Sequence, residues 1–241
     1  MFKIPRSTLD MLETGSTMVC NPPFEGMNPK NFRVLCRPNE FIVVLFYKRA
    51  FSNFSASKVP VLINNTQVFF PCGEAMFKCA CAAYFKNWDI FEKVFKSNTP
   101  LEAKNATKEI PNFKPKEWDS VSYHVMVEVQ KWKSCDTEVF YSLQSIHDLA
   151  VKNQVEIENV IFMESTSNDN LWGTGIDTDD MAIIIEQSNT DDILSGSIYT
   201  PAENLLGLAI TSVFQEMTGK THDAYMSEVS MTSTLFALCE I

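Results

Sequence analysis

Residues 164–175 read ESTSNDNLWGTG and are the most informative stretch of this chain. The stretch sets a carboxylate, Asp169, three residues before an aromatic side chain, Trp172, with Gly173 and Gly175 immediately after it. An aromatic ring offers a flat face to a base or a sugar, and glycine lets a ligand approach the backbone closely. The stretch therefore predicts a loop that holds a nucleotide-like ligand beside an acid.

The size and composition of the chain favour one helix-rich domain with extensions. The chain has 241 residues, of which 45% are hydrophobic, so it can bury a sizeable core. No Pro-, Gly- or Ser-rich linker divides it, and the domain is expected over residues 41–217. Residues 1–40 contain five prolines and few periodic apolar positions, which indicates an irregular N-terminal extension. Residues 218–241 are expected to form a tail packed on the domain.

The net charge and the cysteines exclude several classes of protein. A net charge of −10 argues against sequence-independent binding to a long duplex, which needs a positive field. A local pocket for one nucleotide or one modified base of a nucleic acid remains compatible, because a few basic residues suffice there. The seven cysteines show neither paired spacing nor a CxxC motif. We therefore expect neither a disulfide framework nor a bound metal.

The hydropathy of the chain indicates a cytoplasmic protein with no membrane partner. The N-terminus lacks the sustained apolar segment of a signal peptide. The longest apolar run, residues 41–47, is far too short to span a bilayer.

The periodicity predicts an α+β fold, a helix-rich single domain with a small antiparallel β component. Helices are expected at about residues 73–86, 115–133, 137–152 and 202–217, and the sequence TPLE at residues 99–102 marks another helix start. Strands are expected at residues 41–47 and 160–163, and a hairpin is expected at residues 59–70 around Asn64 and Asn65. We expect residues 176–200 to form an insertion that holds a strand over residues 181–186 between acidic patches.

Four further segments complete a pattern with the ESTSNDNLWGTG stretch. Residues 51–54 read FSNF, residues 71–77 read PCGEAMF, a predicted helix carries Trp118 and Met126, and residues 204–207 read NLLG. In this order and spacing the chain resembles the NADAR/YbiA-like family over roughly residues 46–217. The SNF, P-x-x-E and E-x-x-x-x-D-x-x-W-G-x-G elements carry the resemblance in combination.

The resemblance implies an N-glycosidase, an enzyme that hydrolyses the bond between a ribose carbon and a nitrogen. One branch of the family acts on phosphorylated ribosylamino-pyrimidine intermediates of riboflavin synthesis, and another removes ADP-ribose from guanine bases in nucleic acid. The resemblance also implies a compact YbiA-like α+β domain that needs no metal and no cofactor.

The expected partner is accordingly an ADP-ribosylated base or a phosphorylated ribosylamine. The extensions and the insertion favour the ADP-ribose branch, whereas the charge of −10 counts against a nucleic-acid substrate. A module that binds an ADP-ribose-like nucleotide without turning it over is the alternative.

The resemblance also assigns expected roles to single residues. Glu74 and Asp169 match the family's two acids, and we expect them to divide two roles, base or oxocarbenium stabiliser and acid or sugar-binding partner. Glu74 is favoured for the first role, and the reverse assignment stays open. The expected substrate-binding residues are Lys48, Arg49, Asn53, Phe54, Phe77, Lys78, Trp118, Glu164, Trp172, Gly173 and Asn204.

The chain departs from the family pattern at two positions. The usual lysine seven residues after the glutamate is Cys81 here, and Lys78 is the candidate replacement for a phosphate contact. The glycine two residues before Asn204 is replaced by Ala202.

Three candidates also have structural alternatives. Glu74 fits a first-turn acid favoured by the helix dipole, Asp169 fits a turn former, and Trp118 fits a core residue.

Overall fold

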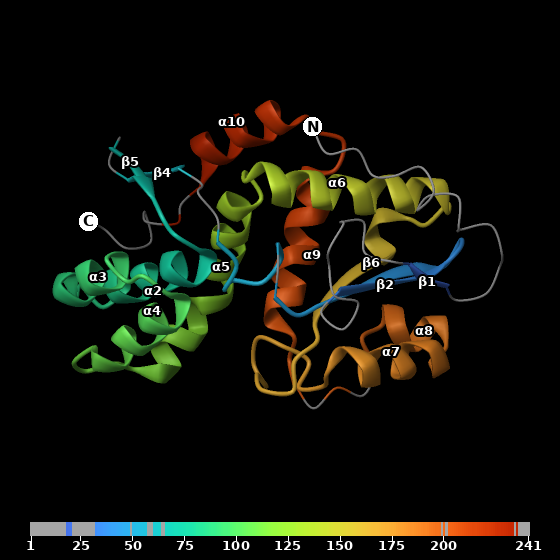
Figure 1. The fold of residues 1–241 in the computed structure, drawn as a ribbon, viewed down its shortest axis with the longest axis horizontal. Helices are drawn as coiled ribbons and strands as arrows, with labels where there is room; N and C mark the ends of the chain where they lie inside the picture. The colour runs from blue at the N-terminus through green and yellow to red at the C-terminus, as the bar shows by residue number, and fades with distance from the viewer. Residues whose placement is uncertain are drawn as a thin grey trace. The chain divides into compact units, whose positions relative to one another are not determined.

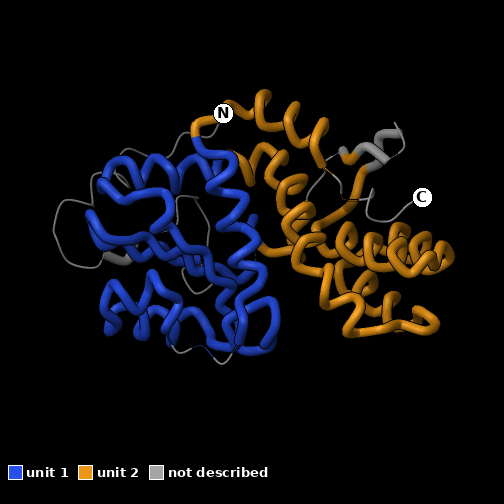
Figure 2. Tube along the Cα trace, turned by 180° about the vertical axis from the view of Figure 1, so that it is seen from behind, with its two compact units in different colours: residues 1–51, 141–218 blue, residues 52–140, 219–241 orange. Residues whose placement is uncertain are grey.

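The chain forms a helix-rich α+β fold, as the sequence predicts (Figure 1). The computed structural model describes residues 18–20, 32–48, 50–56, 60–63, 66–198, 200, 202–233 and 235. The fold divides into two compact units, each built from two separate stretches of chain (Figure 2). Unit 1 contains residues 1–51 and 141–218, and unit 2 contains residues 52–140 and 219–241.

The main sheet lies in unit 1 and is mixed, not purely antiparallel as expected. Its strands, in order across the sheet, are β1 (Met18–Cys20), β2 (Phe32–Arg37), β3 (Phe41–Phe46) and β6 (Val160–Glu164). The first three pair antiparallel, whereas β3 and β6 pair parallel. The parallel pair is possible because more than a hundred residues separate β3 from β6, which is ample for a crossover.

The expectation of an irregular extension over residues 1–40 was wrong for two segments, β1 and β2. The prolines that suggested irregular structure flank the strands and do not interrupt them, since β2 lies between Pro29 and Pro38. β2 pairs along its whole length with the fully buried β3. Residues 1–17 and 21–31 lie outside the described part of the chain.

The strand expected over residues 181–186 was also wrong, because this segment belongs to helix α7 (Thr178–Gln187). Asp177 caps the helix, and its Oδ1 accepts the backbone N–H groups of Asp179 and Asp180, both at 3.1 Å. Ile185 is fully buried while Ile183 is 51% exposed, a difference that the alternation of a strand cannot produce.

Helix α7 and the short α8 (Thr190–Leu194) pack on the sheet of unit 1. Met181, Ala182 and Ile185 join a buried cluster with side chains of β2 and β3. Arg33 of β2 pairs with Asp179, and Arg37 donates from Nη1 to Thr190 Oγ1 at 3.2 Å. The segment expected as an insertion therefore covers one face of the sheet.

Helix α9 (Leu205–Met217) lies against β6 in unit 1. It begins three residues later than expected because Asn204 adopts a left-handed conformation, with φ 51°, at its start. The Asn204 side chain bridges to the strand: its Oδ1 accepts Glu164 N–H at 3.0 Å, and its Nδ2 donates to Phe162 O at 3.0 Å. A Cβ at Gly207 would lie only 2.2 Å from Phe162 O, so glycine permits this close approach.

Unit 2 consists of helices and a hairpin. Its elements are β4 (Pro60–Ile63), β5 (Thr66–Phe69), α2 (Gly73–Tyr84), α3 (Trp88–Phe95), α4 (Pro100–Ala106), the 3₁₀ turn η1 (Thr107–Glu109), α5 (Pro115–Lys133) and α10 (His222–Thr232). The hairpin is confirmed by the antiparallel pairing of β4 and β5, while its turn, Asn64 and Asn65, lies outside the described residues. Helix α6 (Thr137–Lys152) begins in unit 2 and continues in unit 1, where the 3₁₀ turn η2 (Ile157–Asn159) precedes β6.

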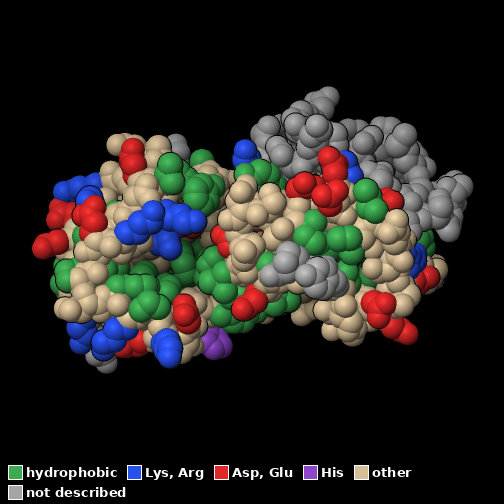
Figure 3. Space-filling view, turned by 90° about the horizontal axis from the view of Figure 1, so that it is seen from below, with side chains coloured by type: hydrophobic (Ala, Val, Ile, Leu, Met, Phe, Trp, Pro, Cys, Tyr) green, Lys and Arg blue, Asp and Glu red, His purple; other side chains and the backbone are tan. Residues whose placement is uncertain are grey.

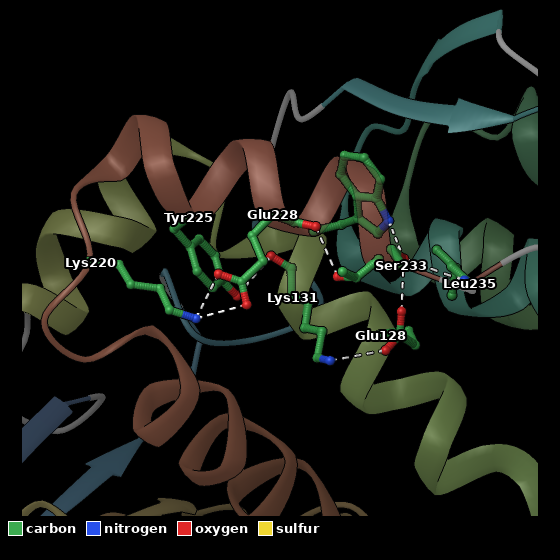
Figure 4. Close-up of polar contacts among 9 residues, drawn as sticks. Glu128, Lys131, Lys220, Tyr225, Glu228, Ser233 and Leu235 are labelled. Carbon is green, nitrogen blue, oxygen red and sulfur yellow. Dashed lines mark hydrogen bonds and ion pairs between the residues drawn. The ribbon is translucent and has the colours of Figure 1, made fainter.

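The start of α4 follows the prediction, and α10 packs within the same unit. Thr99 Oγ1 accepts Glu102 N–H at 3.2 Å while Glu102 Oε2 accepts Asn98 N–H at 2.8 Å, which confirms the predicted helix start. The tail forms helix α10, which packs on α5 (Figure 4). Trp132 Nε1 donates to Ser233 Oγ at 2.7 Å, and Tyr225 Oη donates to Lys131 O at 3.4 Å.

None of the helices in the described ranges is both long and apolar enough to cross a membrane.

The helical assignment of α7 predicts unequal effects for two neighbouring isoleucines. Ile185→Ala should lower the free energy of unfolding by about 2–5 kcal/mol, because it removes a fully buried side chain. Ile183→Ala should change it by less than about 0.5 kcal/mol, because Ile183 faces solvent. Urea denaturation measures both. Equal losses from the two variants would support a strand.

The approach of α9 to β6 makes Gly207 sensitive to a single methyl group. Gly207→Ala should cost about 1–3 kcal/mol of stability, since the new Cβ meets the Phe162 carbonyl and not a movable side chain. Leu208→Ala on the same helix is the control, because Leu208 is 45% exposed. Thermal unfolding of the two variants tests this, and an unchanged Tm for Gly207→Ala contradicts the close contact.

Candidate functional site

Glu74 lies in the first turn of α2, at a helix start that the chain buries. Cys72 is the N-cap, and its Sγ accepts Ala75 N–H at 3.4 Å. Glu74 itself is only 7% exposed. A first-turn position favours a carboxylate, because the free N–H groups give the helix N-terminus a partial positive charge.

The SNF turn holds the start of α2. Asn53 O accepts the backbone N–H of Glu74 at 2.9 Å, and Ser52 O accepts Ser55 N–H at 3.0 Å within the turn. Gly73 fits tightly against this turn, since a Cβ there would lie 2.7 Å from Asn53 Oδ1. The structure therefore brings together two of the segments that carry the sequence pattern, SNF and P-x-x-E.

Helix α5 supports the same turn from its buried face. Gln130 Nε2 donates to Asn53 Oδ1 at 2.6 Å, and Asn53 Nδ2 donates to Met126 Sδ at 3.1 Å. Lys133 Nζ donates to Ser52 O at 2.6 Å. The amide of Asn53 is thus engaged within the protein, where the sequence suggested a contact to substrate.

Gln130 and Lys133 are site residues that the sequence analysis missed. Both are buried, and Lys133 is fully so. The available signal was their spacing: Met126, Gln130 and Lys133 lie four and three residues apart, so they share one helix face. That face borders the apolar stripe of α5, where a polar side chain needs a buried partner.

A cation and an aromatic cluster lie next to Glu74. Lys78 Nζ is 3.8 Å from Glu74 Oε1 and 5.1 Å from the centre of the Phe77 ring. Trp118 packs against Phe77 with ring centres 5.3 Å apart and is only 6% exposed. Its position fits the core alternative, whereas Phe54 is exposed.

The pKa of the Cys72 thiol depends on its burial and on the charges around it. Burial raises the pKa of Cys72, and the Glu74 carboxylate raises it further, while the Ala75 N–H and the Lys133 ammonium lower it. Both a negative and a positive side chain therefore act on the N-cap of α2. Cys81, at the position of the usual family lysine, is buried in the same helix and forms no disulfide.

The ESTSNDNLWGTG loop of unit 1 is held by its own side chains and by α9. Asp169 Oδ1 accepts the backbone N–H groups of Leu171 and Trp172 at 3.1 and 2.8 Å, as expected of a turn former. Gly173 O accepts Asn204 N–H at 3.0 Å. Asp169 and Trp172 are half-buried.

The remaining candidates near β3 are basic. Lys48 is exposed, adopts φ 70°, and places its Nζ 4.9 Å from the centre of the Tyr47 ring. Arg49 lies outside the described residues.

The candidates therefore fall into two groups, one in each unit. Unit 2 holds Asn53, Phe54, Glu74, Phe77, Lys78 and Trp118, and unit 1 holds Lys48, Glu164, Asp169, Trp172, Gly173 and Asn204. The joint action of Glu74 and Asp169 stays a prediction, which substitution tests below. Within the described ranges, no three His, Cys, Asp or Glu side chains are grouped so that they could hold a metal ion.

Comparison with known proteins identifies a family and a similar solved structure. The chain is similar to the E. coli protein YbiA, solved by NMR, with 16% sequence identity and a TM-score of 0.45 over 76% of this chain and 87% of that one. No curated protein matches the chain. The family model of the NADAR domain matches residues 44–218, which is most of the chain. The SNF, P-x-x-E and W-G-x-G elements follow one another within this range. The chain therefore belongs to the NADAR family.

Proposed function

We propose that this protein is an N-glycosidase that removes ADP-ribose from a modified guanine base in nucleic acid. Membership of the NADAR family supports a glycosidase-type function. The observation that carries the proposal is the burial of Glu74 at the start of α2. The side chain of Glu74 is 9% exposed, whereas those of the first-turn acids Glu117, Asp179 and Asp223 are 43%, 53% and 98% exposed.

The reaction needs a carboxylate in such a place. As the ribose–nitrogen bond breaks, positive charge develops on the sugar ring, and a nearby carboxylate stabilises it or orients the attacking water. The water oxygen bonds to the anomeric carbon, and a proton passes to the leaving nitrogen. We assign the first task to Glu74. Asp169 is the proposed acid or sugar-binding partner.

The distribution of charge is compatible with a phosphorylated ligand near Glu74. Unit 2 carries 12 basic and 13 acidic side chains, whereas unit 1 carries 8 basic and 17 acidic ones. The acidity of the chain thus resides almost entirely in unit 1. On the face drawn in Figure 3, one group of lysine and arginine side chains lies among uncharged and hydrophobic atoms, while acidic side chains are scattered over the face. Lys78 is the proposed phosphate contact in unit 2. Trp172 is the proposed stacking surface, and stacking of a base on an aromatic ring contributes about 1–3 kcal/mol to binding.

Two other functions each have an observation in their favour. The net charge of −10 favours a small free substrate, such as a phosphorylated ribosylamino-pyrimidine, over nucleic acid. Cys81 in place of a lysine favours a module that binds ADP-ribose without cleaving it. The buried acid beside a cation favours catalysis over binding alone, because a carboxylate repels a phosphorylated ligand.

Glu74→Gln should abolish most of the turnover without unfolding the protein. An oligonucleotide that carries ADP-ribosylated guanine is incubated with each variant, and released ADP-ribose is quantified. We expect a fall of about 10²–10⁴-fold in kcat, because the amide cannot stabilise positive charge or accept a proton. Glu117→Gln, an exposed first-turn acid, is the matched control.

Incubation of the wild type with this oligonucleotide and, separately, with a phosphorylated ribosylamine distinguishes the three functions. Release of ADP-ribose by the wild type supports the proposal, and release from a phosphorylated ribosylamine alone supports the second function. A stable complex without release identifies a binder. Folded Glu74→Gln with full turnover rules out the role given to Glu74.

Substitutions of Asp169 separate its charge from its place in the loop. Asp169→Asn keeps an oxygen for the two backbone N–H groups and removes the charge, whereas Asp169→Ala removes both. We expect Asp169→Asn to keep its Tm and lose at least about tenfold in kcat/KM, and Asp169→Ala to lose about 1 kcal/mol of stability as well. Wild-type kcat/KM in Asp169→Asn would leave this residue with a turn-forming role only.

A further inference from the structure

Lys133 is a fully buried lysine at the C-terminal end of α5. Lysine is almost never fully buried, because removing an ammonium group from water costs more than one hydrogen bond to a carbonyl returns. The dipole of α5 does favour a cation here. Lys131 already supplies one, with a side chain that is 18% exposed and lies 3.3 Å from Glu128. Helix stability alone therefore does not account for the buried charge of Lys133.

The contacts of Lys133 lead to Glu74 in two steps. Its Nζ donates to Ser52 O at 2.6 Å, which fixes the first residue of the SNF turn. The next residue of that turn, Asn53, accepts the backbone N–H of Glu74 at 2.9 Å. All four residues belong to unit 2. The ammonium group thus holds the turn on which the start of α2 rests.

Lys133 and Glu74 also act on one common atom. The negative charge of Glu74 raises the pKa of the Cys72 thiol at the N-cap of α2, and the positive charge of Lys133 lowers it. The buried cation therefore lies within electrostatic reach of the helix start that carries the carboxylate.

We propose that Lys133 is the positioning residue of the Glu74 site. Its ammonium group holds the SNF turn, through which the Glu74 backbone is fixed, and its buried positive charge acts on the same N-cap thiol as the Glu74 carboxylate. This inference rests on the proposed function, since the reaction is what a misplaced Glu74 would slow. No contact of Lys133 with substrate is part of it.

Lys133→Met, which keeps the length of the side chain, tests the role kinetically. We expect kcat on the ADP-ribosylated oligonucleotide to fall about 10²-fold with little change in KM, because a displaced acid impairs chemistry more than binding. Lys133→Arg retains a cation and a donor and should keep a larger share of kcat. Lys116→Met, at an exposed position of the same helix, should behave as the wild type.

Two kinetic results overturn the proposal. One is a folded Lys133→Met with the kcat of the wild type. The other is an equal loss of kcat in the Met and Arg variants that is matched by an equal loss of Tm, which assigns Lys133 a packing role only.

An NMR measurement tests the positioning role of Lys133 without an activity assay. This test also applies if Lys133→Met does not fold. The wild type should show a slowly exchanging lysine ammonium signal that is absent from Lys133→Arg. The Glu74 backbone amide should shift in Lys133→Arg and stay in place in Lys116→Met. The absence of a protected ammonium signal, or an unmoved Glu74 amide, overturns the inference. A wild type that releases nothing from any substrate disproves the proposed function, and the NMR result still decides the link from Lys133 to Glu74.

Discussion

The hydrogen bond from the Glu74 amide to the Asn53 carbonyl is the constraint on which the candidate site depends. The first N–H groups of a helix have no partner within the helix, and burying them without one is costly. Here Asn53 O accepts the N–H of Glu74, and Cys72 Sγ accepts that of Ala75. The helix start can therefore be buried, and the acid in its first turn is buried with it. A solvated cap would leave Glu74 at the surface.

In unit 1, side chains provide the hydrogen-bond partners that backbone groups need. Asp169 Oδ1 closes the turn before Trp172, and the Asn204 amide satisfies two backbone groups of β6. Asp169, predicted to be the acid or sugar-binding partner, and Asn204, predicted to bind substrate, thus both bind backbone groups of the protein itself. A loop ordered by internal bonds loses less conformational entropy when a ligand binds, so these structural roles support recognition and do not compete with it.

Local signals in the sequence were sufficient wherever local physics decides the structure. The TPLE start of α4 and the full extent of α5 follow from caps and apolar period. Residues 181–186 were misassigned because a short apolar run rich in β-branched residues fits a strand and a buried helix equally well. β2 was missed because nearby prolines were counted without regard to their place at its ends. The spacing of Gln130 and Lys133 places them on one helix face, but their partners could not be inferred from sequence, because these partners lie about eighty residues earlier in the chain.

The burial of Glu74 is difficult to explain by stability alone. A carboxylate near a helix N-terminus gains about 0.3–1 kcal/mol at an exposed position, as is available to Asp223. Removing a carboxylate from water costs several kcal/mol even after relaxation, and a lysine at 3.8 Å offsets only part of that cost. Lys133 adds a second buried charge to the same unit. A fold selected for stability would place both groups in solvent, so their joint burial in one unit supports the proposal that stability is given up here for chemistry.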